Sequence, residues 1–354
     1  MSQSLVNLAL LASTAQAAYA FFTTPEAALA ALTQQQRADF TDAEARRFLG
    51  NLVDPNLSSG QGFDLRHHQP NDPSGFSASV FFDKSSNRYV LAIRGTEDLA
   101  DIIEDVNRIG IQGYAGDQAV SLYRYYRRLT TPAGQPVSYS ETEISRLQLM
   151  RLGVSVNPSA IAIGAIKATR LRGQLALDVG TTPDSSGGGP SVLAPGAPLT
   201  VTGHSLGGHL ALLFGRLFPG VTDHVYTYNA PGIGLVGELG LRGLGVRPID
   251  PSRVTNVASI MGREAISLIW SKPGELVGMA TEPGSLLQNH SVVPLTDTLA
   301  LYGAIATLSP GLATNAEAIG AIIAAASSRA EDSLERTLDA LRRALGIEAD
   351  PTQV

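Results

Sequence analysis

The feature that most constrains the fold of this chain is the stretch LTVTGHSLGGHL, residues 199–210. A short β-type run, LTVT, leads into a serine that stands between glycines, and the segment after it, GGHLALLFGRLF, has helical spacing. Such a strand–turn–helix arrangement holds a serine in a strained turn, and glycines there remove the Cβ atoms that would clash where strand and helix approach. The pattern therefore favours a nucleophile at Ser205.

Two other interpretations of this stretch are a phosphate-binding loop and a plain Gly-rich connection. A phosphate-binding loop needs G-K-[ST] or G-x-G-x-x-G where the helix opens, and neither occurs here. A Gly-rich connection is common in a chain with 36 glycines, but it does not explain the flanking strand and helix. In the nucleophile interpretation the backbone N–H of Leu206 lies at a helix N-terminus, where it can stabilise an oxyanion.

Length and composition suit one large globular domain, residues 1–354, with 44% hydrophobic and 16% charged residues. The net charge of −6 and the lack of a basic block argue against a nucleic-acid partner. The chain has no cysteine, which excludes disulfides and thiolate metal sites. No metal cluster with ligand spacing and no cofactor motif occurs, so we expect neither a metal nor a cofactor.

The N-terminal segment MSQSLVNLALLASTAQAAYAFF resembles a signal peptide, and AYA resembles a cleavage site. However, it carries no Lys or Arg, and four polar residues dilute its apolar run: Asn7, Ser13, Thr14 and Gln16. We therefore predict an amphipathic helix that belongs to the fold. No run of 18 apolar residues exists, so no membrane span is predicted.

Along the chain, β-type runs alternate with segments of helical spacing, which indicates an α/β fold with a mainly parallel, covered sheet. Residues 51–75 are rich in Gly, Pro, Asn and Asp and predict a loop. A hairpin is predicted up to Gly95, and further strands at 199–203, 224–232, 253–260 and 275–282. Residues 130–198 are predicted to form a lid-like insertion of mixed apolar and low-complexity character, and residues 303–354 a helical C-terminal extension.

A serine nucleophile needs a base, and the order expected for a nucleophile elbow in such a fold is serine, acid, histidine. Of the six histidines, only His224 and His290 follow the elbow helix. His224 opens a strand, which favours a structural role. His290 lies in a loop that enters a helix after the last predicted strand, where the base belongs. For His204 and His209, which flank the serine, we expect packing or supporting roles.

The acid is less well defined by the sequence. Glu264 is the first carboxylate after the strand at 253–260, and an acid that only orients the imidazole can be Glu as well as Asp. Glu275, Glu282 and Asp297 come later in the chain. A solvated loop position for Glu264 is the alternative to a catalytic one.

Five segments occur in the order found in class 3 lipases, a family with the α/β-hydrolase fold: VLAIRGTEDLADIIED, GYAGDQAVSLYRYY, VTGHSLGGHLA, VYTYNAPG and NHSVV. Over roughly residues 80 to 300 the chain resembles this family. It looks most like the bacterial members that form the N-terminal catalytic region of larger secreted proteins with calcium-binding repeats. Those repeats are not in this chain.

The resemblance implies a serine carboxylic ester hydrolase in which Ser205 is the nucleophile and His290 the base. Leu206 and Thr96 match the residues whose N–H groups form the oxyanion hole. Glu264 stands where the family often has Asp in D-P-V, whereas this chain has E-A-I. Matching RVTN without a gap would instead place Ser259 there, and a serine cannot act as the acid.

The family resemblance also implies an acylglycerol substrate, contact with a lipid–water interface and secretion, with a cytoplasmic location as the alternative. The insertion at 130–198 is about twice the length expected for the family, and its apolar stretch VSVNPSAIAIGAI predicts part of a lid. A buried helical hairpin is the other interpretation. A phospholipase A1, an acyltransferase, a serine peptidase and a non-catalytic binding module of the same fold remain the alternative functions.

Overall fold

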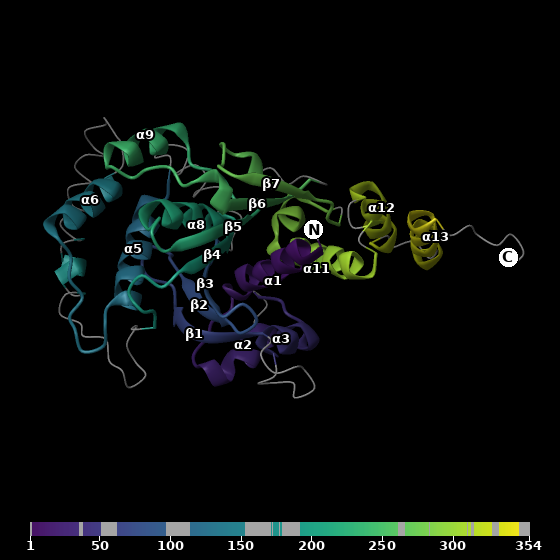
Figure 1. Ribbon diagram of the computed structural model, residues 1–354, viewed down its shortest axis with the longest axis horizontal. Coiled ribbons are helices and arrows are strands. Elements are labelled where there is room, and N and C mark those ends of the chain that lie inside the picture. The colour runs from purple at the N-terminus through teal and green to yellow at the C-terminus, as the bar shows by residue number, and fades with distance from the viewer. Residues whose placement is uncertain are drawn as a thin grey trace, which may run out of the picture.

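The computed structural model describes residues 2–34, 38–50, 62–96, 114–152, 171, 173–176, 178, 192–260, 266–282, 284–309, 311–312, 315–327 and 333–346. Its centre is a seven-stranded sheet in which the strands lie in chain order, from β1 to β7. Helices cover both faces of this sheet (Figure 1).

The strands are β1 (Phe63–Gln69), β2 (Ala78–Asp83), β3 (Arg88–Ile93), β4 (Leu199–His204), β5 (Thr222–Tyr228), β6 (Val254–Ser259) and β7 (Glu275–Met279). β1, β2 and β3 pair antiparallel, and every pair from β3 to β7 is parallel. The predicted hairpin and the predicted mainly parallel sheet are therefore confirmed. The antiparallel strands come first in the chain, and the five parallel strands β3 to β7 follow, with helices in the connections between them. This arrangement is an α/β-hydrolase fold.

The helices on one face of the sheet are α5 (Gly116–Thr130) and α8 (Leu206–Leu217), with α6 (Glu141–Leu152) packed on α5. On the other face lie α1 (Ser2–Ala17) and α11 (Val292–Leu308), which pack against each other (Figure 1). The remaining helical segments are η1 (Pro25–Ala27), α2 (Ala28–Gln34), α3 (Asp42–Leu49), α9 (Leu235–Gly243), η3 (Pro251–Arg253), η4 (Ile266–Leu268), α10 (Leu286–His290), α12 (Ala316–Ala326) and α13 (Ser333–Leu345).

Strand periodicity divides the core between the two faces. Leu91 and Ile93 of β3 belong to the apolar cluster that includes α5 and α8, whereas Val90 and Ala92 belong to the cluster that includes α1 and α11. Side chains of a strand alternate between the faces, so a run of consecutive apolar residues is stable only where both faces are covered. The continuous apolar run of β3 is therefore consistent with a strand that helices cover on both faces.

The N-terminal segment is a helix of the fold, as predicted, but it is buried on more than one side. Residues Leu8, Leu11, Ala12 and Ala15 of α1 are all buried between the sheet and α11. Its polar residues have partners inside the protein: the Thr14 hydroxyl donates to a carbonyl one turn earlier, and the Gln16 amide donates to a carbonyl near α3. Thr14 and Gln16, two of the four polar residues that dilute this segment, are therefore buried with their hydrogen bonds satisfied, whereas Asn7 is exposed.

The prediction of a loop over residues 51–75 is wrong in its second half, because β1 occupies Phe63–Gln69. The segment FDLRHHQ carries few of the apolar residues that usually mark a strand. Only Phe63 and Leu65 are buried, since β1 is the edge strand and much of it faces solvent. An edge strand with polar side chains is a common protection against pairing between sheets of different molecules.

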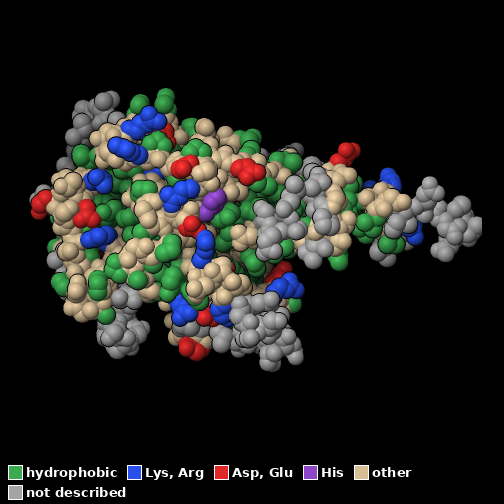
Figure 2. Space-filling model, viewed as in Figure 1, with side chains coloured by type: hydrophobic (Ala, Val, Ile, Leu, Met, Phe, Trp, Pro, Cys, Tyr) green, Lys and Arg blue, Asp and Glu red, His purple; other side chains and the backbone are tan. Residues whose placement is uncertain are grey.

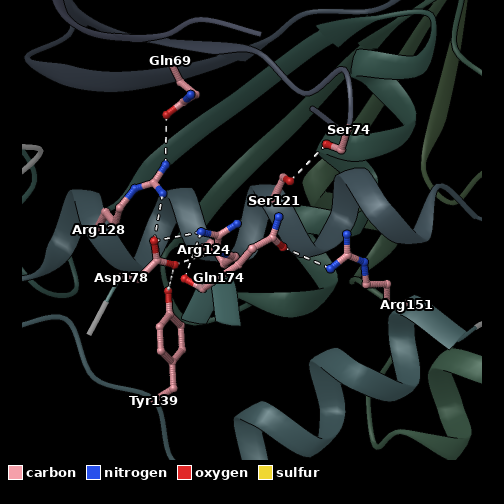
Figure 3. A network of polar contacts seen from close by, with 9 residues as sticks. All are labelled: Gln69, Ser74, Ser121, Arg124, Arg128, Tyr139, Arg151, Gln174 and Asp178. Carbon is pink, nitrogen blue, oxygen red and sulfur yellow. Dashed lines mark hydrogen bonds and ion pairs between the residues drawn. The ribbon is translucent and has the colours of Figure 1, made fainter. Parts of the chain in front are cut away.

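An ion-pair network around the buried Asp178 connects part of the 130–198 insertion to α5. The Asp178 carboxylate accepts hydrogen bonds from Arg124, at 2.6 and 2.9 Å, from Arg128 at 3.3 Å and from the Tyr139 hydroxyl at 3.0 Å (Figure 3). Leu147 of α6 is buried in the same apolar cluster as α5. The described parts of the insertion are thus packed on the body. The apolar stretch VSVNPSAIAIGAI lies outside the described residues, so the lid stays a prediction.

The C-terminal helices α12 and α13 pack against each other and extend from one end of the molecule (Figure 1). On the face seen in Figure 2, basic and acidic side chains are interspersed rather than gathered by sign. None of the helices in the described part of the chain has the length and apolar run that crossing a membrane requires.

Candidate active site

The carboxyl ends of the parallel strands lie along one edge of the sheet, and Ser205 and the loop that leads to Thr96 follow these ends. The register pairs Ile93, the last residue of β3, with Gly203 of β4, and it pairs His204 with Tyr228, the last residue of β5. The carboxyl ends of parallel strands are where α/β folds place their ligands. Ser205 follows β4 directly and begins the path into α8.

The turn at Ser205 has the strained geometry that the sequence predicts. Ser205 has φ 54° and ψ −128°, a backbone conformation that residues other than glycine rarely adopt. A Cβ on Gly203 would lie 2.7 Å from the Gly208 nitrogen, and one on Gly207 would lie 2.8 Å from the Arg94 carbonyl carbon. Neither space admits a side chain. The glycines therefore allow α8 to start directly against β3 and β4.

The structure brings Ser205 and His290 together although 85 residues separate them. The Ser205 Oγ lies 2.8 Å from His290 Nε2, and both side chains are almost fully buried, at 2% and 3% exposed. His290 is the last residue of α10, and α11 begins two residues later. With a proton on Nδ1, the neutral imidazole accepts the serine proton at Nε2, which is the arrangement of an activated nucleophile.

The two residues predicted to supply N–H groups to an oxyanion, Leu206 and Thr96, belong to segments that meet at the serine. Leu206 is the first residue of α8, and the N–H groups of a first helical turn have no acceptor within the helix. The loop after β3 passes close to the serine, because a Cβ on Gly95 would lie 3.2 Å from the Ser205 Cβ. Thr96 follows Gly95 in the chain. Both candidate donors thus come from segments that meet at the nucleophile.

The acid predicted at Glu264 lies outside the described residues, between Ile260 and η4, so its role stays a prediction. The strand that precedes it in the chain, β6, ends at Ser259, next to β5. The Ser259 hydroxyl itself is paired with that of Thr281, at 2.5 Å.

None of the other carboxylates considered from the sequence has a described contact with His290. Glu275 begins β7 opposite Thr255, at the other end of the strands from the site. Glu282 accepts a hydrogen bond from Ser327 of the C-terminal region, at 3.1 Å. Asp297 lies on α11, with its side chain exposed.

Of the other histidines, His224 has the structural role expected of it. Its Nε2 lies 2.9 Å from the Thr255 hydroxyl, near the amino ends of β5 and β6. His209 supports the elbow helix: its Nδ1 donates to the Gly232 carbonyl at 3.0 Å, and its Nε2 accepts from the Ala115 N–H at 3.3 Å. Burial lowers the pKa of His209 to about 4, which keeps the ring neutral near pH 7.

Two residues contact the backbone of the predicted base: His204, for which a packing or supporting role was expected, and Asn229, which sequence reasoning missed. His204 Nε2 lies 2.6 Å from the His290 carbonyl oxygen, and the Asn229 amide lies 3.3 Å from the same oxygen. Asn229 also has a left-handed φ of 44°. The available signal was the Asn-Ala-Pro-Gly turn after a strand, because Asn tolerates that backbone region better than most residues.

Among the residues that the structure describes, no group of three or more His, Asp or Glu side chains is arranged to hold a metal ion.

No protein-family model matches this chain, and no curated protein matches it. Solved structures that resemble it include the Lip2 lipase of Yarrowia lipolytica, which is 19% identical, covers 78% of this chain and 79% of its own, and superposes with a TM-score of 0.36. A lipase of Rhizopus microsporus var. chinensis is 14% identical over 78% of this chain and 75% of its own, with a TM-score of 0.35. Lipase II of Rhizopus niveus is 14% identical over 75% of each chain, with a TM-score of 0.32. Such weak similarity carries no conclusion about activity.

Proposed function

We propose that this protein is a serine carboxylic ester hydrolase, and specifically a lipase that cleaves acylglycerol esters. The observation that carries the proposal is the buried hydrogen bond between Ser205 and His290, with the serine held at a left-handed backbone angle at the start of α8. A buried Ser–His pair at a nucleophile elbow is the arrangement that acyl transfer through a serine requires.

In the proposed reaction the Ser205 Oγ attacks the ester carbonyl carbon while its proton moves to His290 Nε2. The backbone N–H groups of Leu206 and Thr96 donate to the developing oxyanion, and Glu264 orients the imidazole through Nδ1. The imidazolium then gives its proton to the leaving alcohol, which departs and leaves an acyl-serine. Water attacks this ester with His290 again as base, and the carboxylic acid is released.

The choice of acylglycerols over other esters rests on the class 3 lipase motifs in the sequence, and so does secretion. Hydrolysis should therefore be measured on three substrates: a soluble p-nitrophenyl ester, an emulsified triglyceride and phosphatidylcholine vesicles. Wild type should cleave the first two. Ser205→Ala and His290→Ala should each lose on the order of 10⁴-fold or more in turnover. Ser121→Ala, a buried serine of α5, serves as the matched control and should retain activity.

Other results of these assays would indicate other functions. Cleavage of phosphatidylcholine but not of triglyceride would indicate a phospholipase A1 in place of a lipase. Transfer of the acyl group to an added alcohol in preference to water would indicate an acyltransferase. An acyl ligand that raises Tm without any ester turnover would indicate a binding module and would refute the proposal. Glu264→Gln should lower kcat strongly if this residue is the acid.

A further inference from the structure

The backbone of His290, and not only its side chain, is held by buried polar groups. His204 Nε2 lies 2.6 Å from the His290 carbonyl oxygen, and the Asn229 amide donates to the carbonyls of Asn289, at 3.1 Å, and His290, at 3.3 Å. All of these side chains are less than 5% exposed. Because they come from the ends of β4 and β5, they fix the position of α10 relative to the sheet.

The hydrogen bonds of His204 define its tautomer. A carbonyl oxygen can only accept, so the His204 Nε2 carries the proton that bonds to His290. Its Nδ1 must then accept, and the Tyr19 hydroxyl lies 2.8 Å from it, as the donor. Burial, and next the neighbouring His290, lower the pKa of His204 to about 3, so this ring is neutral around pH 7.

This neutral ring also suits the electrostatics of the proposed reaction. The rings of His204 and His290 have their centroids 4.9 Å apart. When His290 takes the serine proton it becomes a cation, and a charged neighbour at that distance would oppose the transfer. A neutral His204 can hold the backbone of the base without this repulsion.

Tyr19 comes from the segment that follows α1 and lies far from the site in the sequence. This residue is 6% exposed, and a Cβ on Gly95 would lie 2.6 Å from its hydroxyl. Tyr19 therefore lies between His204 and the loop after β3 that contains Gly95. A second tyrosine, Tyr228, also joins the sheet to α1, through a hydroxyl that donates to the Leu8 carbonyl at 2.9 Å. Its side chain makes no described contact with either histidine.

We propose that Tyr19 is a positioning residue that acts through His204 on the backbone of His290 and so maintains the geometry between the imidazole and Ser205. This inference rests on the proposed hydrolase function. Proximity catalysis is sensitive to such positions, since a displacement of about 1 Å can cost roughly 10²-fold in rate. The described hydrogen bond of the tyrosine goes to His204 and not to Ser205 or the His290 ring, so its removal should affect turnover and not substrate binding.

The test compares Tyr19→Phe with Tyr228→Phe on a soluble p-nitrophenyl ester. Both variants lose one buried hydroxyl that links the α1 region to the sheet, and both should show similarly lowered Tm values. Tyr19→Phe should lose about 10-fold or more in kcat with KM unchanged, because the proposed role concerns the base alone. Tyr228→Phe should keep the wild-type kcat.

A second measurement does not depend on activity. In wild type, ¹⁵N NMR of the imidazoles should show His204 as the neutral Nε2–H tautomer from pH 5 to pH 8. A cationic His204, or one protonated only at Nδ1, would overturn the inference even if Tyr19→Phe failed to fold.

Failure of the inference and failure of the proposed function give different results. If wild type cleaves esters and the two tyrosine variants have equal kcat, the positioning role is wrong and the hydrolase stands. If wild type cleaves no ester, the function itself is wrong, and the positioning role falls with it.

Discussion

Replacement of Gly207 by alanine should separate the two proposed oxyanion donors, Leu206 and Thr96. A Cβ on Gly207 would lie 2.8 Å from the Arg94 carbonyl carbon and closer still to the Ile93 carbonyl oxygen. Heavy atoms normally approach to about 3.5 Å, so the start of α8 and the end of β3 must move apart by roughly 1 Å. That movement carries Leu206 away from Thr96.

Two magnitudes follow from this displacement. Overpacking a tight site costs about 1–3 kcal/mol in the free energy of unfolding. Loss of one oxyanion donor costs about 10²–10³-fold in kcat, so Gly207→Ala should lose activity far beyond its loss of stability. The assays are urea unfolding and hydrolysis of a soluble p-nitrophenyl ester, both at a temperature where the variant is folded.

Gly243 offers a matched control, because it also lies in a helix but a Cβ there would meet nothing within 4 Å. Gly243→Ala should keep wild-type kcat and gain up to about 1 kcal/mol of stability, from the better helix propensity of alanine. If Gly207→Ala retains kcat within a factor of two and is as stable as Gly243→Ala, the close approach of α8 to β3 and its role in the oxyanion hole are both refuted.

Two further predictions concern stability. Asp178→Ala should lower the free energy of unfolding by about 3 kcal/mol, since it removes a buried carboxylate and leaves the half-buried Arg124 and Arg128 without an ion-pair partner. Asp339→Ala, from an exposed pair, should cost less than about 1 kcal/mol, and equal losses in urea unfolding would contradict this. Stability should also fall as pH drops from about 6.5 to 4, because His204 and His209 have folded pKa values of about 3 and 4 and the unfolded chain therefore binds more protons in that range. Each contributes a slope of about 1.4 kcal/mol per pH unit, and unfolding free energies that stay constant between pH 7.5 and 5 would contradict the prediction.

The sequence predicts those parts of the site that depend on local geometry or on chain order. The elbow at Ser205 is predictable because glycines are required on both sides of one short turn, and all of them lie within a few residues. His290 is predictable because the order of nucleophile and base follows the order of parallel strands. The strand β1 was missed because it is an edge strand whose side chains are mostly polar.

The hydrogen bonds that hold the backbone of His290 could not be predicted from the sequence in the same way. Tyr19, His204 and Asn229 come together at the backbone of His290 only after α1, β4, β5 and α10 have packed together, and neither Tyr19 nor Asn229 stands out in its own sequence segment. For His204, beside the serine, the sequence indicates a packing or supporting role but not the group that it contacts. Its hydrogen bond to the His290 carbonyl depends on contacts across 86 residues, which periodicity and spacing do not contain.

The most direct test of the central claim is covalent labelling with a fluorophosphonate, followed by peptide mass spectrometry. The reagent phosphonylates an activated serine with loss of fluoride. The account predicts one adduct per chain, located at Ser205, and labelling that is much slower in His290→Ala and absent in Ser205→Ala. A chain that stays unlabelled, or that is labelled at another serine, would contradict the assignment of Ser205 as a nucleophile activated by His290.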